Sequence, residues 1–447
     1  MLWKSLEGKS QLLLFSTRVN RHLRFTSFTI FIFVLLVLPD VAFGVERFPP
    51  PQFDDHELPV TTVPEPRRDL YEYLDVAALL AALSLASYLA LKKRSRRGVF
   101  LLGIFSLLYF GFWRKGCVCS IGATQNIVLA LFESGYTAPI TVIAFFILPL
   151  IFTLFFGRTF CAAVCPLGAI QDVVAIRPIK VPSWLEHALR LLPYIYLSAA
   201  VLFAATGSAF IICEYDPFVA FFRRSGSLNM LILGACFLLV GVFVGRPYCR
   251  FLCPYGVMLN LVSKASKWHV TITPGECIQC RLCEDSCPFG SIERPTQELR
   301  IHNRAEGKKM LAILISLLPL FIALSSWLGV LISPALSRVH ATVSLAERVW
   351  LEDTGKIEET TDASEAFRRT GRPTEELYNE ALTLKKRFTF GGGMFGAFIG
   401  LVIGIKLINL SIRRRRMDYE VNRGTCLSCG RCFSYCPIEH VRLKKSS

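Results

Sequence analysis

Residues 277–287 read Cys-Ile-Gln-Cys-Arg-Leu-Cys-Glu-Asp-Ser-Cys and precede Pro288, and residues 426–436 read Cys-Leu-Ser-Cys-Gly-Arg-Cys-Phe-Ser-Tyr-Cys and precede Pro437. Both runs have the spacing C-x2-C-x2-C-x3-C-P, which is typical of bacterial [4Fe–4S] sites. Zinc is disfavoured because its structural sites usually take their ligands from two separated pairs. The sequence therefore predicts two [4Fe–4S] clusters and assigns eight of the 16 cysteines to them.

The composition is typical of a polytopic membrane protein. Of the 447 residues, 53% are hydrophobic and 35 are Phe, and the mean hydropathy is +0.45. The formal net charge of +16 could suggest nucleic acid, but the basic residues cluster beside apolar runs, as the positive-inside rule requires. We therefore expect a mainly α-helical membrane bundle of about seven to eight helices, in contact with membrane lipid and without a nucleic-acid partner.

Two basic clusters set the predicted orientation. Residues 92–97 read Lys-Lys-Arg-Ser-Arg-Arg after one apolar run, and residues 413–416 are four arginines after the last one. The positive-inside rule places both clusters in the cytoplasm, so we expect a multi-pass protein of the inner membrane of a bacterium. The predicted spans are 75–91, 98–113, 137–156, 190–211, 228–245, 310–332 and 390–411.

The remaining parts follow from this topology and from composition. The predicted parts are a signal peptide or first membrane helix (1–44), an exposed Pro-rich acidic linker (45–74), a membrane bundle (75–263), the first half of a ferredoxin-like domain (264–305), a membrane helix (310–332), an extracytoplasmic segment (333–388), a membrane helix (389–412) and the second half of the ferredoxin-like domain (413–447). The extracytoplasmic segment has few large apolar residues, so a docking surface or a partly disordered loop is expected there.

The two cysteine runs are separated by two membrane spans, yet both emerge on the cytoplasmic side in this topology. They can therefore meet as one small α+β domain with two clusters. In the general ferredoxin pattern the fourth cysteine of each run reaches the other cluster. The predicted ligands are Cys277, Cys280, Cys283 and Cys436 for cluster 1, and Cys426, Cys429, Cys432 and Cys287 for cluster 2. In the alternative, each run keeps its own fourth cysteine.

An internal repeat carries four more cysteines. Residues 157–168 read Gly-Arg-Thr-Phe-Cys-Ala-Ala-Val-Cys-Pro-Leu-Gly, and residues 245–256 read Gly-Arg-Pro-Tyr-Cys-Arg-Phe-Leu-Cys-Pro-Tyr-Gly. A C-x3-C spacing within a helix would put both thiols on one face at the end of an inward-running span. The four thiols, Cys161, Cys165, Cys249 and Cys253, could then converge on a further cluster or metal, or they could simply pack helices.

A partial third copy of this repeat begins at Cys119, because residues 119–126 match residues 165–172. The topology places Cys117, Cys119 and Cys213 on the extracytoplasmic side, where they could ligate a redox centre or form a disulfide. The stretch Ser120–Thr124 resembles a threonine flavinylation site only faintly, and the repeat already explains it, so covalent flavin is not expected. Cys236 lies within a predicted span and is assigned to packing.

The last predicted span carries a glycine stripe. Gly392, Gly396, Gly400 and Gly404 are spaced four residues apart, which puts them on one helix face. Such a stripe allows a neighbouring membrane helix to approach closely.

Several kinds of chemistry have no support in the sequence. None of the seven histidines lies within a predicted span, and no C-x-x-C-H motif is present, so haem is not expected. A phosphate-binding loop and a dinucleotide fingerprint are also absent from the sequence. One-electron transfer by iron–sulfur clusters remains, with the chain acting as an electron-transfer subunit and not as a stand-alone enzyme.

The paired C-x3-C-P motifs followed by two ferredoxin runs resemble the NosR/NirI and NapH group of membrane-bound iron–sulfur proteins. The resemblance covers roughly residues 98–300 and 420–440. It departs from NosR in one respect, because residues 45–70 are too short for the large extracytoplasmic flavin-binding domain of that type. The two membrane spans between the ferredoxin runs are a second departure, from the NapH architecture.

The resemblance implies electron transfer between a quinol or cytoplasmic donor and an extracytoplasmic reductase, flavoprotein or other redox partner. The alternative function is a redox-sensing regulatory or maturation factor for a periplasmic metalloenzyme. A scaffold that recruits a partner through the extracytoplasmic segment is the third possibility.

Overall fold

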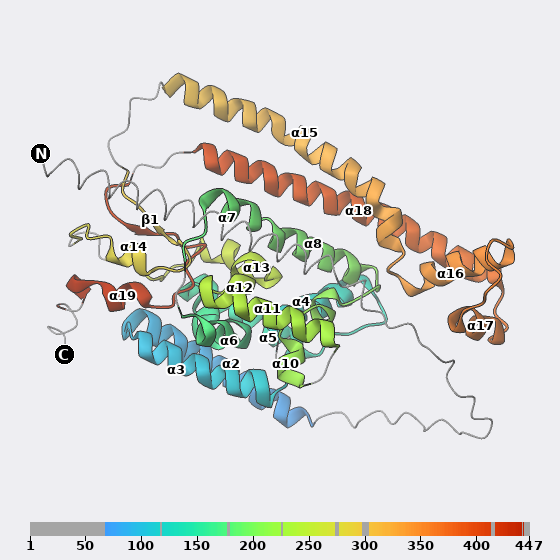
Figure 1. Ribbon diagram of the computed structural model, residues 1–447, viewed down its shortest axis with the longest axis horizontal. Coiled ribbons are helices and arrows are strands. Elements are labelled where there is room, and N and C mark those ends of the chain that lie inside the picture. The colour runs from blue at the N-terminus through green and yellow to red at the C-terminus, as the bar shows by residue number, and fades with distance from the viewer. Residues whose placement is uncertain are drawn as a thin grey trace, which may run out of the picture. The chain divides into compact units, whose positions relative to one another are not determined.

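The computed structural model describes residues 68–116, 119–176, 179–224, 227–272, 277–296, 304–412, 416–439 and 441. The predicted signal peptide or first helix (1–44), most of the linker (45–74), Cys117 and residues 413–415 of the second basic cluster lie outside these residues. The described part is mainly helical, as predicted. Its elements are shown in Figure 1, where α15 and α18 run side by side.

Five of the described helices are long and apolar enough to cross a membrane. They are Asp69–Lys92 (α2, Asp69–Ser87, with a π-helical end), Arg96–Trp113 (α3, Arg96–Ser106, with a π-helical end), Ser183–Ala205 (α7, Ser183–Leu189, and α8, Leu192–Ala205), Ala305–Ser337 (in α15, Arg304–Ser337) and Thr374–Ser411 (α18). Three shorter apolar helices are α4 (Ser120–Phe132), α5 (Ile140–Phe156) and α11 (Leu228–Phe243). Each predicted span therefore contains a helix, whereas α4 was not predicted.

Short helices fill the bundle between these spans. They are α6 (Pro166–Val174), α9 (Ile211–Glu214), α10 (Val219–Arg223), α12 (Pro247–Phe251) and α13 (Pro254–Ser263). α5 ends at Gly157, whose φ of 71° suits glycine and reverses the chain. α6 and α13 each begin with proline, which is favoured at the first helical position because its missing N–H needs no partner there. The bundle therefore contains two hairpins that carry the C-x3-C-P repeats.

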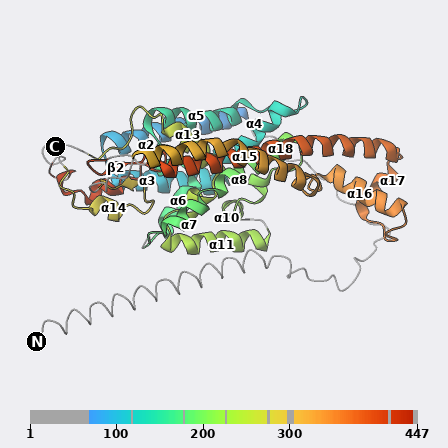
Figure 2. The same ribbon diagram turned by 90° about the horizontal axis from the view of Figure 1, so that it is seen from above.

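α15 and α18 pack through their backbones, which confirms the predicted glycine stripe. Gly392, Gly396, Gly400 and Gly404 are all buried, and the nearest atoms to the first three are on α15. A Cβ at Gly396 would lie 1.9 Å from the carbonyl oxygen of Ser325. Figure 2 shows the same two helices side by side from a second direction.

A small helical unit precedes the glycine stripe. α16 (Ala341–Asp353), α17 (Asp362–Arg369) and the first turns of α18 share a core that contains Val343, Val349, Phe367 and Leu377. This unit, which we call the distal unit, corresponds to the predicted extracytoplasmic segment. A partly disordered loop was one expectation for it, and the structure has packed helices there.

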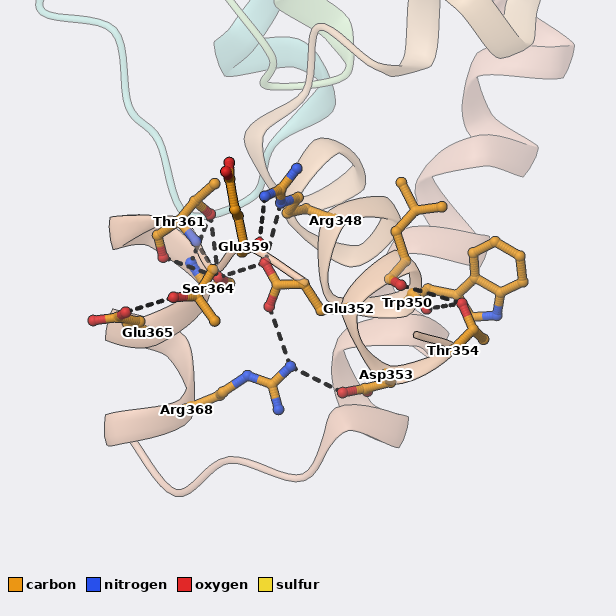
Figure 3. A network of polar contacts seen from close by, with 12 residues as sticks. Arg348, Trp350, Glu352, Asp353, Thr354, Glu359, Thr361, Ser364, Glu365 and Arg368 are labelled. Atoms are coloured by element: carbon orange, nitrogen blue, oxygen red, sulfur yellow. Dashed lines mark hydrogen bonds and ion pairs between the residues drawn. The ribbon is translucent and has the colours of Figure 1, made fainter. Parts of the chain in front are cut away.

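Ion pairs of Arg368 with Glu352 and Asp353 link α17 to α16 within the distal unit (Figure 3). Glu352 accepts hydrogen bonds from Arg348 at 3.0 Å, Ser364 at 2.8 Å and Arg368 at 3.2 Å. Burial alone would raise the pKa of this carboxyl group, but the three donors outweigh it and hold the pKa below its usual value. The network ties the loop between α16 and α17 to both helices.

The two predicted ferredoxin segments meet in space. Strand β1 (Ile292–Glu293) pairs antiparallel with β2 (Glu420–Val421), with Ile292 opposite Val421. α14 (Leu282–Ser286) packs against α19 (Arg431–Tyr435). Cys283, Ile292 and Tyr419 form a small shared core. Residues on either side of the α15–α18 excursion therefore build one α+β unit.

Candidate metal centres

Two cavities lie in this α+β unit, and each is lined by cysteines of both runs. Around the first cavity the cysteines are Cys277, Cys280, Cys283 and Cys436. Around the second they are Cys287, Cys426, Cys429 and Cys432. Each cavity thus receives three thiols from one run and, from the other run, the thiol that precedes proline.

The two runs share an unusual backbone conformation. Gln279 and Ser428, at equivalent positions between the first two cysteines, are left-handed with φ of 52° and 53°. The residues after the second cysteines are left-handed too, with φ of 64° at Arg281 and 73° at Gly430. This conformation costs a non-glycine residue roughly 1–2 kcal/mol, so it persists only where the surroundings hold it. These reversals bend each run around its cavity, which brings successive thiols to the same lining.

Burial makes Cys426 and Cys283 poor acids in the absence of a metal. It raises the pKa of Cys426 to about 12 and that of Cys283 to about 11. A coordinating thiol is deprotonated by its metal, so metal binding and ionisation are coupled here. Four thiols around one cavity match the donor set of a [4Fe–4S] cluster. Within the described ranges, no three His, Cys, Asp or Glu side chains are grouped closely enough for a single metal ion.

The C-x3-C-P repeats do not lie on single helices. Cys161 is in the π-helical turn Phe160–Val164, whereas Cys165 caps the N-terminus of α6. In the second copy Cys249 is in α12 and Cys253 caps the N-terminus of α13. The prediction that each pair shares one helix face is wrong, because the proline after the second cysteine starts a new helix in a new direction.

The first repeat continues from Cys165 into α6, which packs beside α3. α6 runs antiparallel to α3, with Leu167 beside Phe110 and with Asp172 accepting a hydrogen bond from Arg96 at 3.1 Å. Cys165 lies at the other end of α6, about 10 Å along the helix axis from Asp172. The position of the C-x3-C-P pairs on the cytoplasmic side of the membrane stays a prediction.

The four thiols of the repeats nevertheless converge. Cys165 is within electrostatic range of Cys161, Cys249 and Cys253, and Cys253 is within range of Cys161 and Cys249. The backbone N–H of Gly256 points at the Sγ of Cys253, 3.3 Å away. Three of the four cysteines are buried in the main core. The structure thus brings together the thiols that the sequence could only propose as a group.

Two buried arginines flank these thiols, and sequence reasoning did not assign them. Arg246 is 1% exposed and donates to both carboxylate oxygens of Asp172, at 3.1 and 2.9 Å, and to the carbonyl oxygen of Ala162 at 3.0 Å. Arg158 lies 3.7 Å from the Sγ of Cys161. Both follow glycine at the same position of the repeat, which is the signal that could have found them.

The same region contacts the second ferredoxin run. Arg158 donates to the carbonyl oxygen of Gly424 at 3.1 Å, and Arg96 donates to that of Cys429 at 3.2 Å. Arg431, within α19, lies 4.0 Å from Asp172. The second cavity is therefore held directly against the C-x3-C-P hairpins.

The other predicted cysteines are dispersed. Cys119 caps the N-terminus of α4 and is within electrostatic range of Cys213, which is exposed in α9. Cys236 is half-buried on α11, as expected for a packing residue. Cys117 lies outside the described residues.

Two family models match the chain, and both are described as a 4Fe-4S binding domain. One matches residues 138–183 and 227–273, which contain the two C-x3-C-P motifs. The other matches residues 270–293, which contain the first ferredoxin run. No solved structure matches the chain.

Three relatives share parts of the sequence. YccM of Escherichia coli, whose name describes an electron transport protein, is 29% identical over 25% of this chain and 34% of its own length. Protein NirI of Paracoccus denitrificans is 31% identical over 27% of this chain and 18% of its own length. The uncharacterized protein MJ0750 of Methanocaldococcus jannaschii is 27% identical over 41% of this chain and 77% of its own length. The chain thus spans about a third or less of the length of the first two.

Apolar helices, a core lined with cysteines and the matching 4Fe-4S domains define a membrane iron–sulfur protein. Within that class the matched parts of the chain are similar to those of NirI and YccM, in agreement with the resemblance of its motifs to NosR/NirI-like membrane 4Fe–4S proteins.

Proposed function

We propose that the chain is a membrane-bound electron-transfer protein with two [4Fe–4S] clusters in its α+β unit. The observation that carries this proposal is the mixed lining of the two cavities, each with three thiols of one run and the fourth of the other. The proposed ligands are Cys277, Cys280, Cys283 and Cys436 for cluster 1, and Cys287, Cys426, Cys429 and Cys432 for cluster 2. When bound, such clusters accept and donate single electrons.

The residues around the second cavity supply a physical connection into the membrane bundle. Arg96 and Arg158 hold the backbone of the second run against the bundle, and the C-x3-C-P thiols lie directly behind Arg158. A further cluster or metal at those four thiols fits the donor set and the family match over both repeats. We therefore place the entry or exit point of electrons at this contact.

The membrane context of the proposal follows from the basic clusters. The α+β unit would face the cytoplasm of a bacterium and the distal unit the outside of its inner membrane. Electrons would pass between a quinol or cytoplasmic donor and an extracytoplasmic reductase or other redox partner. The E. coli relative YccM is named for electron transport, which supports this class of function.

Paired cysteine variants test the ligand assignment. Protein purified without oxygen should contain at least about eight irons per chain, and Cys436→Ser should lose about four. Adding Cys277→Ser to Cys436→Ser should cost no further iron, because both residues ligate cluster 1. Adding Cys426→Ser instead should remove about four more. The reverse pattern would show that each run keeps its own fourth cysteine, and fewer than about four irons in the wild type would remove the two-cluster proposal.

Reconstituted vesicles test the function itself. A quinol or a reduced ferredoxin should reduce an acceptor across the membrane, and the rate should fall to background in Cys436→Ser. A regulatory or maturation factor would bind its clusters equally well but would not pass electrons at the rate of a carrier. Normal iron content without transfer would therefore select the alternative function.

A further inference from the structure

The two C-x3-C-P copies each carry an arginine at the same position, and each arginine reaches into the other copy. A Cβ on Gly168 of the first copy would lie 3.1 Å from the Nη1 of Arg246, which belongs to the second copy. A Cβ on Gly256, the equivalent residue of the second copy, would lie 3.4 Å from the Nη2 of Arg158, which belongs to the first. The two copies therefore exchange arginines in an approximately symmetric way.

The carboxylate that neutralises one of these arginines has no counterpart for the other. Arg246 forms an ion pair with Asp172 at 2.9 Å. The residue of the second copy that is equivalent to Asp172 is Asn260. Within the described ranges Arg158 pairs with no carboxylate, and its guanidinium donates to the carbonyl oxygen of Gly424 at 3.1 Å. The repeat is thus symmetric in position but not in charge.

Asn260 lies where the missing carboxylate is expected. A Cβ on Gly424 would collide with the Oδ1 of Asn260, so Asn260 and Arg158 both reach Gly424. The Oδ1 of Asn260 and the Nε of Arg158 are both buried without a hydrogen-bond partner in the part of the chain that the structure describes. A neutral amide at this place leaves the charge of the guanidinium uncompensated.

Burial makes that charge consequential. Arg158 is 7% exposed, and a buried charge without a counter-ion costs free energy unless an anion lies nearby. Neighbouring Arg190 does not supply one, because it is itself positive and its partner Glu186 also pairs with Arg250. The structure therefore points to an anion other than a carboxylate.

Several thiols lie around Arg158. The Sγ of Cys161 is 3.7 Å from its guanidinium. The other thiols within its electrostatic range are Cys249, Cys253 and Cys426. Cys426 lines the second cavity, whose four thiols match the donor set of a [4Fe–4S] cluster. Because Gly424 is only two residues before Cys426, the guanidinium is within roughly 10 Å of that cavity.

We propose that Arg158 supplies an uncompensated positive charge that raises the reduction potential of cluster 2. Reduction adds one electron, and hence one negative charge, so a nearby positive charge stabilises the reduced form. In an effective dielectric of about 20, a unit charge roughly 10 Å away changes a one-electron equilibrium by about tenfold. Arg158 thereby favours an electron on the cluster that contacts the membrane bundle over an electron on cluster 1.

Asn260→Asp is the decisive variant, because it restores the carboxylate of the other copy and leaves Arg158 in place. The assay is a redox titration with dithionite, followed by EPR, on the full chain purified without oxygen. The signal of cluster 2 is the one that Cys426→Ser loses. At a fixed potential the ratio of reduced to oxidised cluster 2 should fall about tenfold, which is about 59 mV for a one-electron couple. Arg158→Gln should shift it in the same direction, whereas Arg158→Lys keeps the charge and should stay near the wild type.

Asn379→Asp is the matched control, because it makes the same chemical change at an exposed position of α18 in the distal unit. It should leave the potential of cluster 2 unchanged. Equal potentials of cluster 2 in the wild type, Asn260→Asp and Arg158→Gln would overturn the inference. A shift confined to a signal that survives in Cys426→Ser would also overturn it, because Arg158 would then act on the thiols of the bundle.

The inference rests on the proposed function, since cluster 2 must form. Iron analysis separates the two failures. A wild type that lacks the iron of cluster 2 would contradict both proposals, whereas full iron content with an unchanged potential in the variants would contradict only the role of Arg158.

Discussion

Gly396→Ala is the substitution for which the structure predicts the sharpest effect on the membrane bundle. A Cβ at Gly396 would lie 1.9 Å from the carbonyl oxygen of Ser325, 2.7 Å from its carbonyl carbon and 3.1 Å from the Cα of Ser326. All three neighbours are backbone atoms of α15, so no side-chain rotation can relieve the clash. The helices must separate by about 1.5 Å to restore van der Waals contact, which a closely packed interface tolerates poorly.

The expected cost follows from two opposing effects. Overpacking a close contact typically costs about 1–3 kcal/mol, and a clash with backbone belongs at the upper end. Alanine regains up to about 1 kcal/mol through its better helix propensity. We therefore expect a net loss of about 2 kcal/mol. Gly393→Ala is the matched control, because its Cβ would meet only the side chains of Val330 and Ser326, at 3.3 and 3.5 Å.

The assay is thermal unfolding in one detergent, followed by iron retention. Both ferredoxin segments are joined to the bundle by α15 and α18, so separation of these helices should also loosen the clusters. Gly396→Ala should unfold at a lower temperature than the wild type and lose iron earlier, whereas Gly393→Ala should match the wild type or exceed it. Equal stability of the two variants would refute the close backbone contact.

Three further predictions follow from other contacts. Asp172→Asn removes the charge that pairs with buried Arg246 and should destabilise the bundle by about 3–5 kcal/mol in unfolding experiments, and a loss under about 1 kcal/mol would contradict the pair's role. Because the folded pKa of Glu352 lies below its usual 4.5, its stabilisation is present above pH 4.5 and lost as pH falls through the folded pKa, so hydrogen exchange in the distal unit should rise in acid and Glu352→Gln should abolish that dependence. Removal of iron with an oxidant and a chelator should expose residues 277–293 and 419–436 to proteolysis together, and exposure of only one segment would count against shared cavities.

Much of the α+β unit was predictable because its signal is local. The spacing of the two cysteine runs predicts eight thiol ligands. The general ferredoxin pattern predicts that each run supplies the fourth ligand of the other run's cluster. The basic clusters beside the apolar runs also predicted that both runs lie on the same side of the membrane. The structure supplies the pairing of Ile292 with Val421, which no local pattern could have indicated in strands of two residues.

The hairpins of the bundle were not predictable by the same means. Hydropathy identifies helices long enough to cross a membrane, whereas α6 and α13 have only nine and ten residues. The C-x3-C-P pairs were expected at the end of an inward-running span, although a proline such as Pro166 is equally suited to begin a helix. The contact of Gln125 with Ile212 joins residues far apart in sequence and depends on the packed bundle.

The buried charges show why composition alone misjudges this interior. Burying an unpaired arginine or aspartate in an apolar core costs free energy. A hydrophobicity scale for membrane insertion would therefore predict that Arg246 and Asp172 are not buried. In the structure the two form a bidentate pair that also holds the carbonyl oxygen of Ala162, next to Cys161, and Arg96 and Arg431 approach the same carboxylate. Asp172 therefore connects the span at Arg96, the hairpin at Arg246 and the second ferredoxin run at Arg431. Because one carboxylate contacts three elements, it fixes the position of the bundle's thiols relative to those of the α+β unit. Electron transfer between the two sets of thiols would depend on that relative position.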